Sequence, residues 1–217
     1  MTASLHDQIS ELCQQCGLRT SPRQHKALAD YLALLHRWNS TYNLTAVREP
    51  AAMLTQHLAD CLAVIPALQG HAESGRLLDV GSGGGLPGVV IATLLPGWDV
   101  TCVDAVGKKM ALVRQVAGTL PLPNLRAEHV RIEQLKHPPF DLITSRAFAS
   151  LADFTRLTRP HLKPAGTWMA MKGRVPDDEL AELPVGVKLF HVEPLVVPGL
   201  DAQRCLVWMR QAGIEPD

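Results

Sequence analysis

The segment 77–92, "LLDVGSGGGLPGVVIA", constrains the fold more than any other part of the chain. An apolar run that ends in Asp79-Val80 is followed by four glycines within positions 81–85, and a second apolar run begins after Pro87. Small residues at such a turn let the backbone approach a ligand closely, and proline suits the first turn of a helix. The segment therefore predicts a strand, a cofactor-binding loop and a helix, in that order.

The rest of the chain after residue 75 repeats this alternation of strand and helix, which is typical of a parallel sheet covered by helices on both faces. We expect strands at 76–80, 98–104, 124–130, 140–145 and 166–171, and helices at 87–95, 107–118 and 148–162. Two further strand-like runs, 186–197 and 203–210, are joined by the short "PGLDA" and predict a closing antiparallel pair. A mostly parallel, Rossmann-like sheet with such a pair resembles the class I S-adenosylmethionine-dependent methyltransferase fold.

Residues 1–70 differ in texture and predict an N-terminal helical extension to a cofactor-binding domain at 71–217. A helix is expected to start at Ser21-Pro22, and one apolar face follows at helical spacing, at Leu28, Tyr31, Leu32, Leu35 and Trp38. The polar segment 39–50 is expected to break this helix, and another helix is expected from about 50 to 68.

Composition indicates a folded protein of the cytoplasm. Apolar residues make up 47% of the 217 positions, yet the apolar runs fall short of the roughly 18 residues that span a bilayer. The first residues resemble no signal peptide, and five cysteines without a framework favour a reducing compartment. Cys13 and Cys16 fit an ordinary helix better than a metal site, so no metal is expected. A formal net charge of zero lowers the expectation of a nucleic-acid partner without excluding a local basic face.

Two cofactors fit the glycine loop. Gly83, Gly85 and Gly88 have the spacing of a dinucleotide-binding loop, which holds a pyrophosphate at a helix N-terminus. Asp79, Gly81, Gly83 and Gly85 instead fit the acid-x-Gly-x-Gly-x-Gly pattern of S-adenosylmethionine enzymes. A carboxylate before the loop opposes a pyrophosphate but can lie near the ammonium group of S-adenosylmethionine, which favours the second interpretation.

Asp104, at the end of the second expected strand, can accept hydrogen bonds from a ribose in either interpretation. Because two acids fall at expected strand ends, a glycine turn without any ligand is the less favoured alternative.

The segment after the fourth expected strand bears on the methyl acceptor. "FDLITS" is followed by "RAFA", not by the Asn- or Asp-Pro-Pro motif of enzymes that methylate amino groups of bases, and the chain holds no Pro-Cys pair for attack on a pyrimidine. A ring nitrogen such as guanine N7 has a free lone pair and needs no proton removed, so holding the reactants in line can suffice. The missing motifs fit an N7 acceptor without proving it.

With these residues in view, the chain closely resembles the ribosomal RNA small subunit methyltransferase G family (RsmG, formerly GidB). The resemblance extends over most of the length and rests on "WNSTYNLTAVRE" (38–49), "HLADCL" (57–62), "LLDVGSGGGLPG" (77–88), "VDAVGKKMALVRQV" (103–116), "RIEQL" (131–135), "FDLITSRAFASL" (140–151) and "MKG" (171–173). It implies a bacterial cytoplasmic enzyme that uses S-adenosylmethionine to methylate N7 of one guanine (guanine-527 in the usual rRNA numbering) in 16S rRNA.

The resemblance also implies site residues. Gly81 and Leu86 in the loop, Ile132 and Glu133, and Arg146 would contact the cofactor, with Glu133 facing the adenine amino group. Together with the loop and strand-end residues, the expected cofactor set is Asp79, Gly81, Gly83, Gly85, Leu86, Asp104, Ile132, Glu133 and Arg146. The chain has Ala105 where the family often has serine, which could remove one hydrogen bond.

Arg146 has two interpretations: a guanidinium that orients the cofactor or contacts an RNA phosphate, which we favour, or a structural ion pair. An Arg bound to guanine O6 and N7 would block the atom to be methylated. We expect no certain acid or base, only a possible positioning role for Arg146. His57 and Asp60 share a helix face, where a structural hydrogen bond that ties the N-terminal helices to the sheet is favoured over a proton relay.

A set of polar, basic and aromatic residues is expected on the RNA side, where cations contact phosphates and Tyr42 stacks on a base. These candidates are Arg37, Asn39, Tyr42, Asn43, Arg48, Lys108, Lys109, Arg114, Lys172 and Arg174. A capped loop under the N-terminal helices is an equal alternative for Asn39, Tyr42 and Asn43, and scattered surface charge is the alternative for the cations.

The sequence thus predicts a monomeric methyltransferase that acts on 16S rRNA or the 30S subunit, leaves S-adenosyl-L-homocysteine as product and needs no membrane. Three alternatives stay open. A small-molecule methyltransferase would have a closed pocket, a non-catalytic cofactor-sensing module would bind S-adenosylmethionine without modifying RNA, and a nicotinamide dehydrogenase is disfavoured by Asp79.

Overall fold

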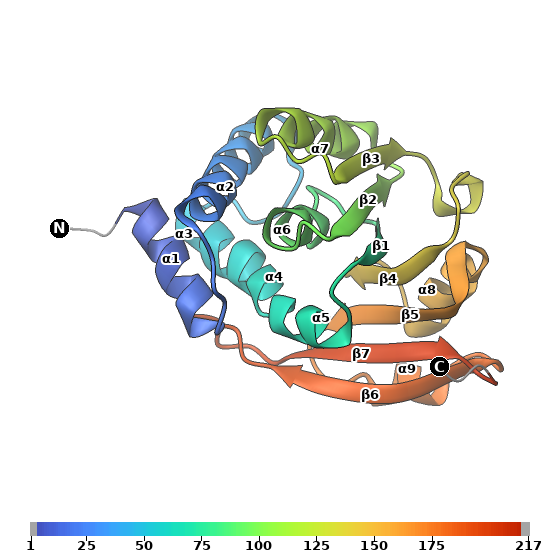
Figure 1. Ribbon diagram of the computed structural model, residues 1–217. Helices are drawn as coiled ribbons and strands as arrows, with labels where there is room; N and C mark the ends of the chain where they lie inside the picture. Colours follow the sequence, from blue (N-terminus) through green and yellow to red (C-terminus); the bar gives the residue numbers. More distant parts are fainter. Residues whose placement is uncertain (1–3, 214–217) are drawn as a thin grey trace.

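The computed structural model describes residues 4–213, whose strands form one seven-stranded sheet in the order β3-β2-β1-β4-β5-β7-β6 (Figure 1). The strands are β1 (Gly75–Val80), β2 (Trp98–Asp104), β3 (Leu125–His129), β4 (Phe140–Arg146), β5 (Leu162–Lys172), β6 (Val187–Leu195) and β7 (Arg204–Gln211). The first five pair in parallel, and β7 lies antiparallel between β5 and β6. The predicted class I fold with its closing antiparallel pair is confirmed.

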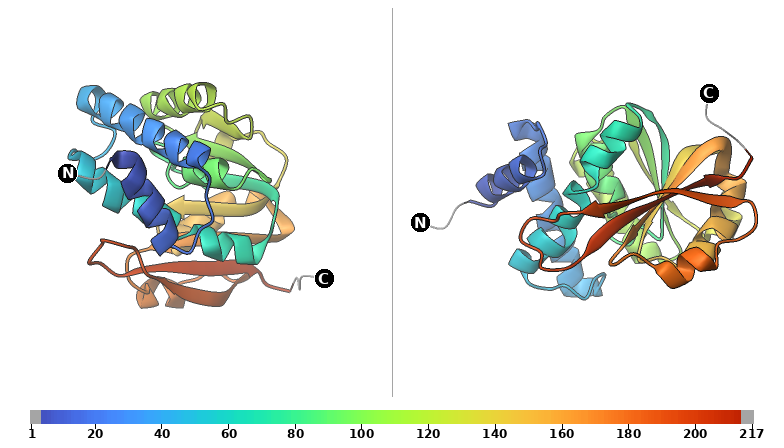
Figure 2. Two further views of the ribbon diagram at one scale, coloured as in Figure 1. Left: turned by 60° about the vertical axis from the view of Figure 1, so that its left-hand side comes forward. Right: turned by 90° about the horizontal axis from the view of Figure 1, so that it is seen from below.

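Helices surround this sheet, with the N-terminal ones on one side of the molecule (Figure 2). The longer helices are α1 (Leu5–Gln15), α2 (Pro22–Tyr42), α5 (Ile65–His71), α6 (Gly88–Leu94), α7 (Gly107–Thr119) and α8 (Leu151–Thr158). The short ones are α3 (Pro50–Met53), the π-helix η1 (Leu54–Ala59), α4 (Asp60–Leu62), the 3-10 helices η2 (Ile132–Gln134) and η3 (Arg159–His161), and α9 (Asp177–Ala181).

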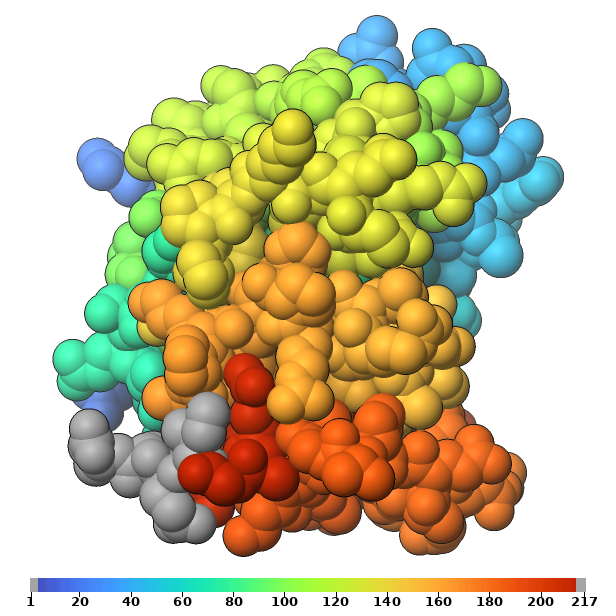
Figure 3. Space-filling view, turned by 90° about the vertical axis from the view of Figure 1, so that its right-hand side faces the viewer, coloured from blue at the N-terminus to red at the C-terminus, as the bar shows by residue number. Residues whose placement is uncertain are grey.

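The strands separate two apolar clusters because successive side chains of a strand point to opposite faces. Leu77 belongs to the cluster beneath the N-terminal helices, α6 and α7, whereas its neighbour Leu78 belongs to the cluster beneath α8. Leu142 and Ile143 of β4 divide in the same way. Figure 3 shows the molecule from the side of α8. The atoms of α8 and its neighbours, in amber, lie between the yellow segment that follows β3 and the orange-red C-terminal part.

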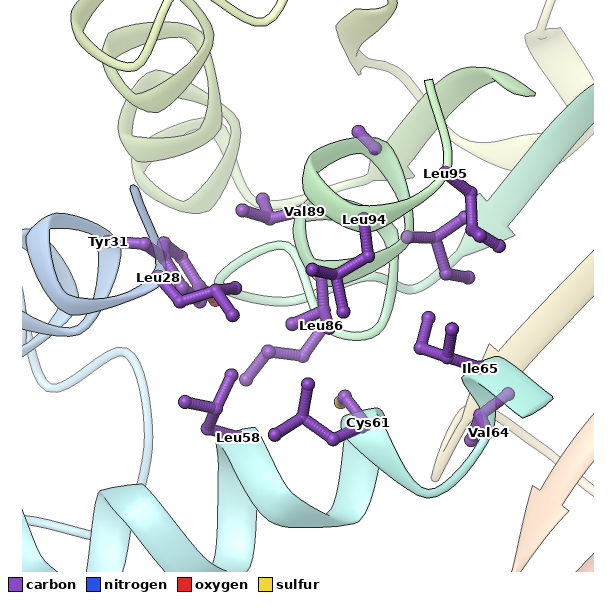
Figure 4. Close-up of a cluster of buried hydrophobic side chains, with 14 of the residues drawn as sticks. Leu28, Tyr31, Leu58, Cys61, Val64, Ile65, Leu86, Val89, Leu94 and Leu95 are labelled. Atoms are coloured by element: carbon purple, nitrogen blue, oxygen red, sulfur yellow. The ribbon is translucent and has the colours of Figure 1, made fainter. Parts of the chain in front are cut away.

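The N-terminal segment shares its core with the sheet. Figure 4 shows Leu28 and Tyr31 of α2, Leu58 of η1 and Leu86 of the glycine loop pointing into one cluster around α6. The Tyr31 hydroxyl also donates a hydrogen bond of 3.0 Å to the carbonyl of Gly84. The N-terminal segment therefore supports the glycine loop directly. The division into an extension at 1–70 and a domain at 71–217 stays a prediction.

The start of α2 is confirmed, but its end is not where the polar segment suggested. Ser21 caps the helix and Pro22 occupies its first turn. The helix continues to Tyr42 and ends at Asn43, which has a left-handed φ of 50°. The expected break at residue 39 is wrong because Asn39 makes its loop contacts with its side chain while its backbone stays helical.

Two other helices differ from their expected bounds. The helix expected at 148–162 begins only at Leu151, because the Ser150 side chain accepts a hydrogen bond of 3.1 Å from the Asp153 amide and caps it there. After Thr158 the chain tightens into η3. The helix expected from about 50 to 68 is interrupted by η1, whose wider π turn lies beside the candidate site described below.

One described stretch, Pro50–His71, has the length and apolar composition of a membrane span. Of its most apolar 18-residue window, 67% is buried inside the protein, as in a helix of a protein core.

Candidate active site

The glycine loop is held by hydrogen bonds to the end of β2. The amides of Gly81 and Ser82 donate to the Val103 carbonyl over 2.9 and 3.2 Å, and the Gly83 amide donates to Asp104 Oδ2 over 3.1 Å. These three loop amides therefore have protein partners and do not converge on an anion. A pyrophosphate-binding loop needs such amides free, so the dinucleotide interpretation is disfavoured by this geometry.

The glycines of the loop are needed for different physical reasons. Gly83 has φ +60°, and a Cβ added to it would meet no heavy atom within 4 Å, so its bare face is turned toward open space. Gly85 is buried, and a Cβ there would come within 2.5 Å of Val89 Cγ2. Gly83 is thus placed to face a ligand, whereas Gly85, expected in the cofactor set, serves the packing of loop against helix.

Asp79 does not face the site as expected from its charge. Its side chain is 0% exposed, and its Oδ2 accepts a hydrogen bond of 2.8 Å from the Gly88 amide beneath the loop. Burial raises the pKa of this carboxyl to about 7, against the opposing effects of the Gly88 amide and Arg146. The expectation that Asp79 lies near a cofactor ammonium is corrected: it ties β1 to the start of α6.

The raised pKa of Asp79 predicts a pH-dependent stability. The folded-state pKa of about 7 exceeds the ordinary aspartate value of 3.8, so the protonated group stabilises the fold at low pH and this contribution is lost as pH rises through about 7. We expect the free energy of unfolding to fall less between about pH 5 and about pH 8 in Asp79→Asn, which keeps an oxygen acceptor for Gly88. Denaturant titrations measure this, with exposed Asp99→Asn as control. Equal pH slopes in the wild type and Asp79→Asn would contradict it.

Two adjoining cavities lie at the carboxyl ends of the parallel strands, where ligands of open α/β sheets bind. The smaller, of about 340 Å³, is lined by Val80, Gly81, Val103, Asp104, Ala105, Lys109, Val130, Arg131, Ile132, Glu133, Ala147, Phe148 and Leu157. The larger, of about 590 Å³, is lined by Leu35, Leu44, Thr45, Gln56, His57, Asp60, Gly81, Ser82, Gly83, Gly84, Leu86, Lys109, Arg146, Ala147, Met171, Lys172, Gly173 and Arg204. They share Gly81, Lys109 and Ala147, so together they form one continuous cleft.

The expected cofactor residues divide between the two cavities. Asp104, Ile132 and Glu133 line the smaller one, where two carboxylates could accept hydrogen bonds from hydroxyl and amino groups. Gly83, Leu86 and Arg146 line the larger one. The Leu86 side chain is buried in the apolar cluster of Figure 4, so only a small part of this residue faces the cleft.

Arg146 forms an ion pair and also lines the cleft. Its Nη1 lies 3.1 Å from Asp60 Oδ2 and 3.2 Å from the Gln56 carbonyl. Arg204 Nε lies 2.8 Å from Asp60 Oδ1. Asp60 therefore ties the N-terminal helices to β4 and β7, as the structural interpretation of this residue expected.

His57 has a different partner from Asp60. Its Nε2 lies 2.8 Å from Thr45 Oγ1, and burial, followed by the charge of Arg146, lowers the pKa of its imidazole. The contact joins the loop after α2 to η1. The expected hydrogen bond between the N-terminal helices and the sheet therefore comes from Asp60 alone of this pair.

Among the expected RNA-side residues, Tyr42 and Lys108 lie together. The Lys108 ammonium lies 5.1 Å from the centre of the Tyr42 ring, and the Trp38 ring lies 5.1 Å from the same centre. Asn43 Oδ1 accepts a hydrogen bond of 3.2 Å from Arg48. This exposed group lies at the end of α2, where it meets the start of α7.

Asn39 does not belong to this exposed group. It is 4% exposed, donates from Nδ2 to the Val47 carbonyl over 2.9 Å and accepts from the Thr45 amide over 2.8 Å. Both halves of its amide are used inside the protein, so the expected role in RNA contact is corrected to support of the loop that follows α2.

The expected cations differ in position. Lys109 and Lys172 line the larger cavity, where Lys109 lies 3.5 Å from Asp104 and Lys172 lies 2.8 Å from Glu179. The exposed cations outside the lining of both cavities are Arg37, Arg48, Lys108, Arg114 and Arg174. Cys13 and Cys16 are free thiols, and no cluster of three metal-ligating side chains occurs within residues 4–213.

Arg204 is a charged cleft residue that sequence reasoning missed. It begins β7, the strand that runs antiparallel to its neighbours, so its position lies at the same edge as the carboxyl ends of β1 and β4. An arginine at the start of the last strand of an expected antiparallel pair was the available signal.

Solved structures support the fold. TrmN from Thermus thermophilus matches with a TM-score of 0.57 at 21% identity, over 73% of this chain and 53% of its own. The glycopeptide N-methyltransferase MtfA, complexed with S-adenosyl-L-homocysteine, matches with a TM-score of 0.58 at 15% identity, over 70% of this chain and 90% of its own.

Sequence relatives support the family. The relative from Leptothrix cholodnii is 57% identical over 93% of this chain and 93% of its own length, and that from Bordetella avium is 52% identical over 94% and 92%. Both are named ribosomal RNA small subunit methyltransferase G. The family model GidB, described as rRNA small subunit methyltransferase G, matches residues 24–207. With the class I sheet and the cleft at its carboxyl edge, these matches show that the chain belongs to the rRNA small subunit methyltransferase G family.

Proposed function

We propose that this protein transfers the methyl group of S-adenosylmethionine to N7 of a guanine in 16S rRNA of the small ribosomal subunit. The observation that carries the proposal is the two-part cleft, which combines a carboxylate-lined cavity with a larger one bordered by basic side chains. The family match supplies the class of substrate. We further propose that the enzyme acts as a monomer in the cytoplasm.

The residues of the smaller cavity fit an adenosine group. Asp104 lies at the end of β2 with its carboxylate toward the loop, where it can accept from a ribose diol. Glu133 is exposed at the rim and can accept from an amino group, and Ile132 offers an apolar surface. Gly83 leaves room for the rest of the cofactor in the larger cavity, whereas the absent side chain of Gly81 makes room for the Phe148 ring.

The larger cavity suits a substrate that enters from outside. Gln56, Ala147 and Gly173 are exposed at its edge, so it opens to solvent and does not enclose a small molecule. S-adenosylmethionine, when bound, supplies an electrophilic methyl group. Guanine N7 presents a lone pair without losing a proton, so this chain needs to hold the base in line and exclude water.

The basic and aromatic residues around the cleft are proposed to bind RNA. Tyr42 and Lys108 offer an exposed ring and cation to the nucleotides around the target, and Arg48 lies next to them through Asn43. Lys109 and Lys172 lie inside the cleft, where their charges can help to position the backbone. We propose Arg37, Arg114 and Arg174 as outer phosphate contacts.

The test is methylation of purified 30S subunits from a strain that lacks the corresponding gene. The protein is incubated with labelled S-adenosylmethionine and either 30S subunits or naked 16S rRNA, and the modified base is mapped. Label at one guanine N7 is the expected result. Cofactor binding without label in 16S rRNA would contradict the proposal and favour a sensing module, whereas label only in small molecules of an extract would favour a small-molecule methyltransferase.

A further inference from the structure

Two guanidinium groups share one buried carboxylate in the cleft. Asp60 is 3% exposed, and its two oxygens lie 3.1 Å from Arg146 Nη1 and 2.8 Å from Arg204 Nε. The three residues come from the N-terminal segment, β4 and β7, so no local sequence preference brings them together. All three line the larger cavity.

The charges of this cluster do not cancel. One carboxylate faces two guanidinium groups, which leaves one positive charge in excess, whereas the lysines of the larger cavity have carboxylates of their own, Lys109 with Asp104 and Lys172 with Glu179. Burying charge is costly, and a purely structural contact would need only one arginine. The excess charge is therefore available to an anion that enters the cleft.

The position of Arg204 indicates which anion it can bind. Arg204 lines only the larger cavity, whereas the junction with the carboxylate-lined cavity is formed by Gly81, Lys109 and Ala147. Its side chain is 25% exposed, and two of its nitrogens are held by Asp60 and by the Gln203 carbonyl. A guanidinium has five N–H donors, so Arg204 keeps donors for a ligand of the larger cavity.

We propose that Arg204 binds a phosphate oxygen of the RNA backbone beside the target nucleotide, oriented by the Asp60 carboxylate that it shares with Arg146. Asp60 is a positioning residue that fixes the directions of both guanidinium groups. A planar guanidinium binds phosphate oxygens with two parallel hydrogen bonds, which fixes orientation as well as affinity. This inference rests on the proposed function.

The test compares Arg204→Gln with Arg210→Gln in the full-length protein. Arg210 lies on the same strand, lines a different cavity and loses the same charge on substitution. For Arg204→Gln we expect the KM for 30S subunits to rise about tenfold and the slope of log affinity for 16S rRNA against log salt to decrease by about one. The dissociation constant for S-adenosylmethionine, measured by calorimetry, should stay at the wild-type value, and Arg210→Gln should match the wild type throughout.

Two further variants separate the phosphate contact of Arg204 from the orienting role of Asp60. Arg204→Lys keeps the charge and should retain the wild-type salt slope while recovering only part of the affinity. Asp60→Asn removes the orienting carboxylate and should raise KM without decreasing the salt slope, because both arginines remain. A merely structural role of Asp60 would lower the unfolding temperature and leave KM unchanged.

Four outcomes would overturn the inference. Equal salt slopes for Arg204→Gln and Arg210→Gln would show that Arg204 binds no phosphate. Weakened S-adenosylmethionine binding in Arg204→Gln would assign the excess charge to the cofactor carboxylate. A wild-type protein that neither binds 16S rRNA nor methylates 30S subunits would refute the proposed function and the phosphate assignment together, whereas an active wild type with an unaffected Arg204→Gln would refute only the assignment.

Discussion

Gly83→Val is expected to abolish binding of S-adenosylmethionine, with at least a hundredfold loss of affinity. The open space beside the Gly83 Cα is part of the larger cavity, so a valine side chain would occupy room that the cofactor needs. The φ of +60° adds strain, because a β-branched residue is disfavoured in the left-handed region by roughly 1–2 kcal/mol. The strain would also disturb the Gly83 amide, which donates to Asp104. Calorimetric titration with S-adenosyl-L-homocysteine measures the effect.

Gly17→Val separates strain from occlusion. Gly17 has φ +71° and likewise has no atom near its added Cβ, but it follows α1 on the exposed surface, outside both cavities. We expect it to lose stability comparable to Gly83→Val in thermal unfolding while it keeps wild-type cofactor affinity. Unchanged affinity in Gly83→Val, or an equal loss in Gly17→Val, would show that the loop does not face the cofactor.

The sheet could be predicted from the sequence because its signals are local. Each buried strand is a short apolar run between turn residues. Successive residues such as Leu77 and Leu78 face opposite sides of the sheet, which can be predicted from the strand alone. The glycine loop was also a local signal, because Gly83 needs a conformation that other residues avoid. Ser21 and Pro22 marked the start of α2 for the same reason, through capping chemistry.

The orientation of polar side chains could not be predicted, because it depends on tertiary contacts. Asp79 stands at the expected strand end, yet its carboxylate turns toward the Gly88 amide, which the chain brings back beneath the loop. Asn39 begins a segment with the polar composition of a surface loop, but it is buried and its side-chain amide is hydrogen-bonded to the backbone of Val47 and Thr45. Arg204 comes close to Asp60 only after β7 inserts between β5 and β6.

The cofactor assignment itself shows how a correct conclusion can rest on an incorrect contact. Asp79 favoured S-adenosylmethionine through an expected ammonium contact, but the buried carboxylate reaches neither cavity. What disfavours a dinucleotide is the use of the loop amides by the Val103 carbonyl and Asp104. The carboxylate that matters for binding is therefore expected to be Asp104.

Asp104→Ala should lower the affinity for S-adenosylmethionine at least a hundredfold, because each of the two hydrogen bonds that the carboxylate would accept from a ribose diol is worth roughly 1.5–3 kcal/mol. The carboxylate also accepts from the Gly83 and Val106 amides, over 3.1 and 2.8 Å, so the loop loses an anchor at the same time. The dissociation constant from calorimetry measures the sum of both effects.

Asp141→Ala is the matched control for the structural part of this loss. Asp141 accepts a hydrogen bond of 2.9 Å from the Arg76 amide and lies 2.7 Å from Lys163, as Asp104 combines amide donors with Lys109, but it stands at the opposite end of the sheet. If the loss of an anchoring carboxylate alone mattered, both variants would lower the unfolding temperature and neither would change binding. Because Asp104 faces the adenosine-sized cavity, we expect only its replacement to weaken binding, and S-adenosylmethionine affinity that is unchanged in Asp104→Ala would show that the ribose is held elsewhere.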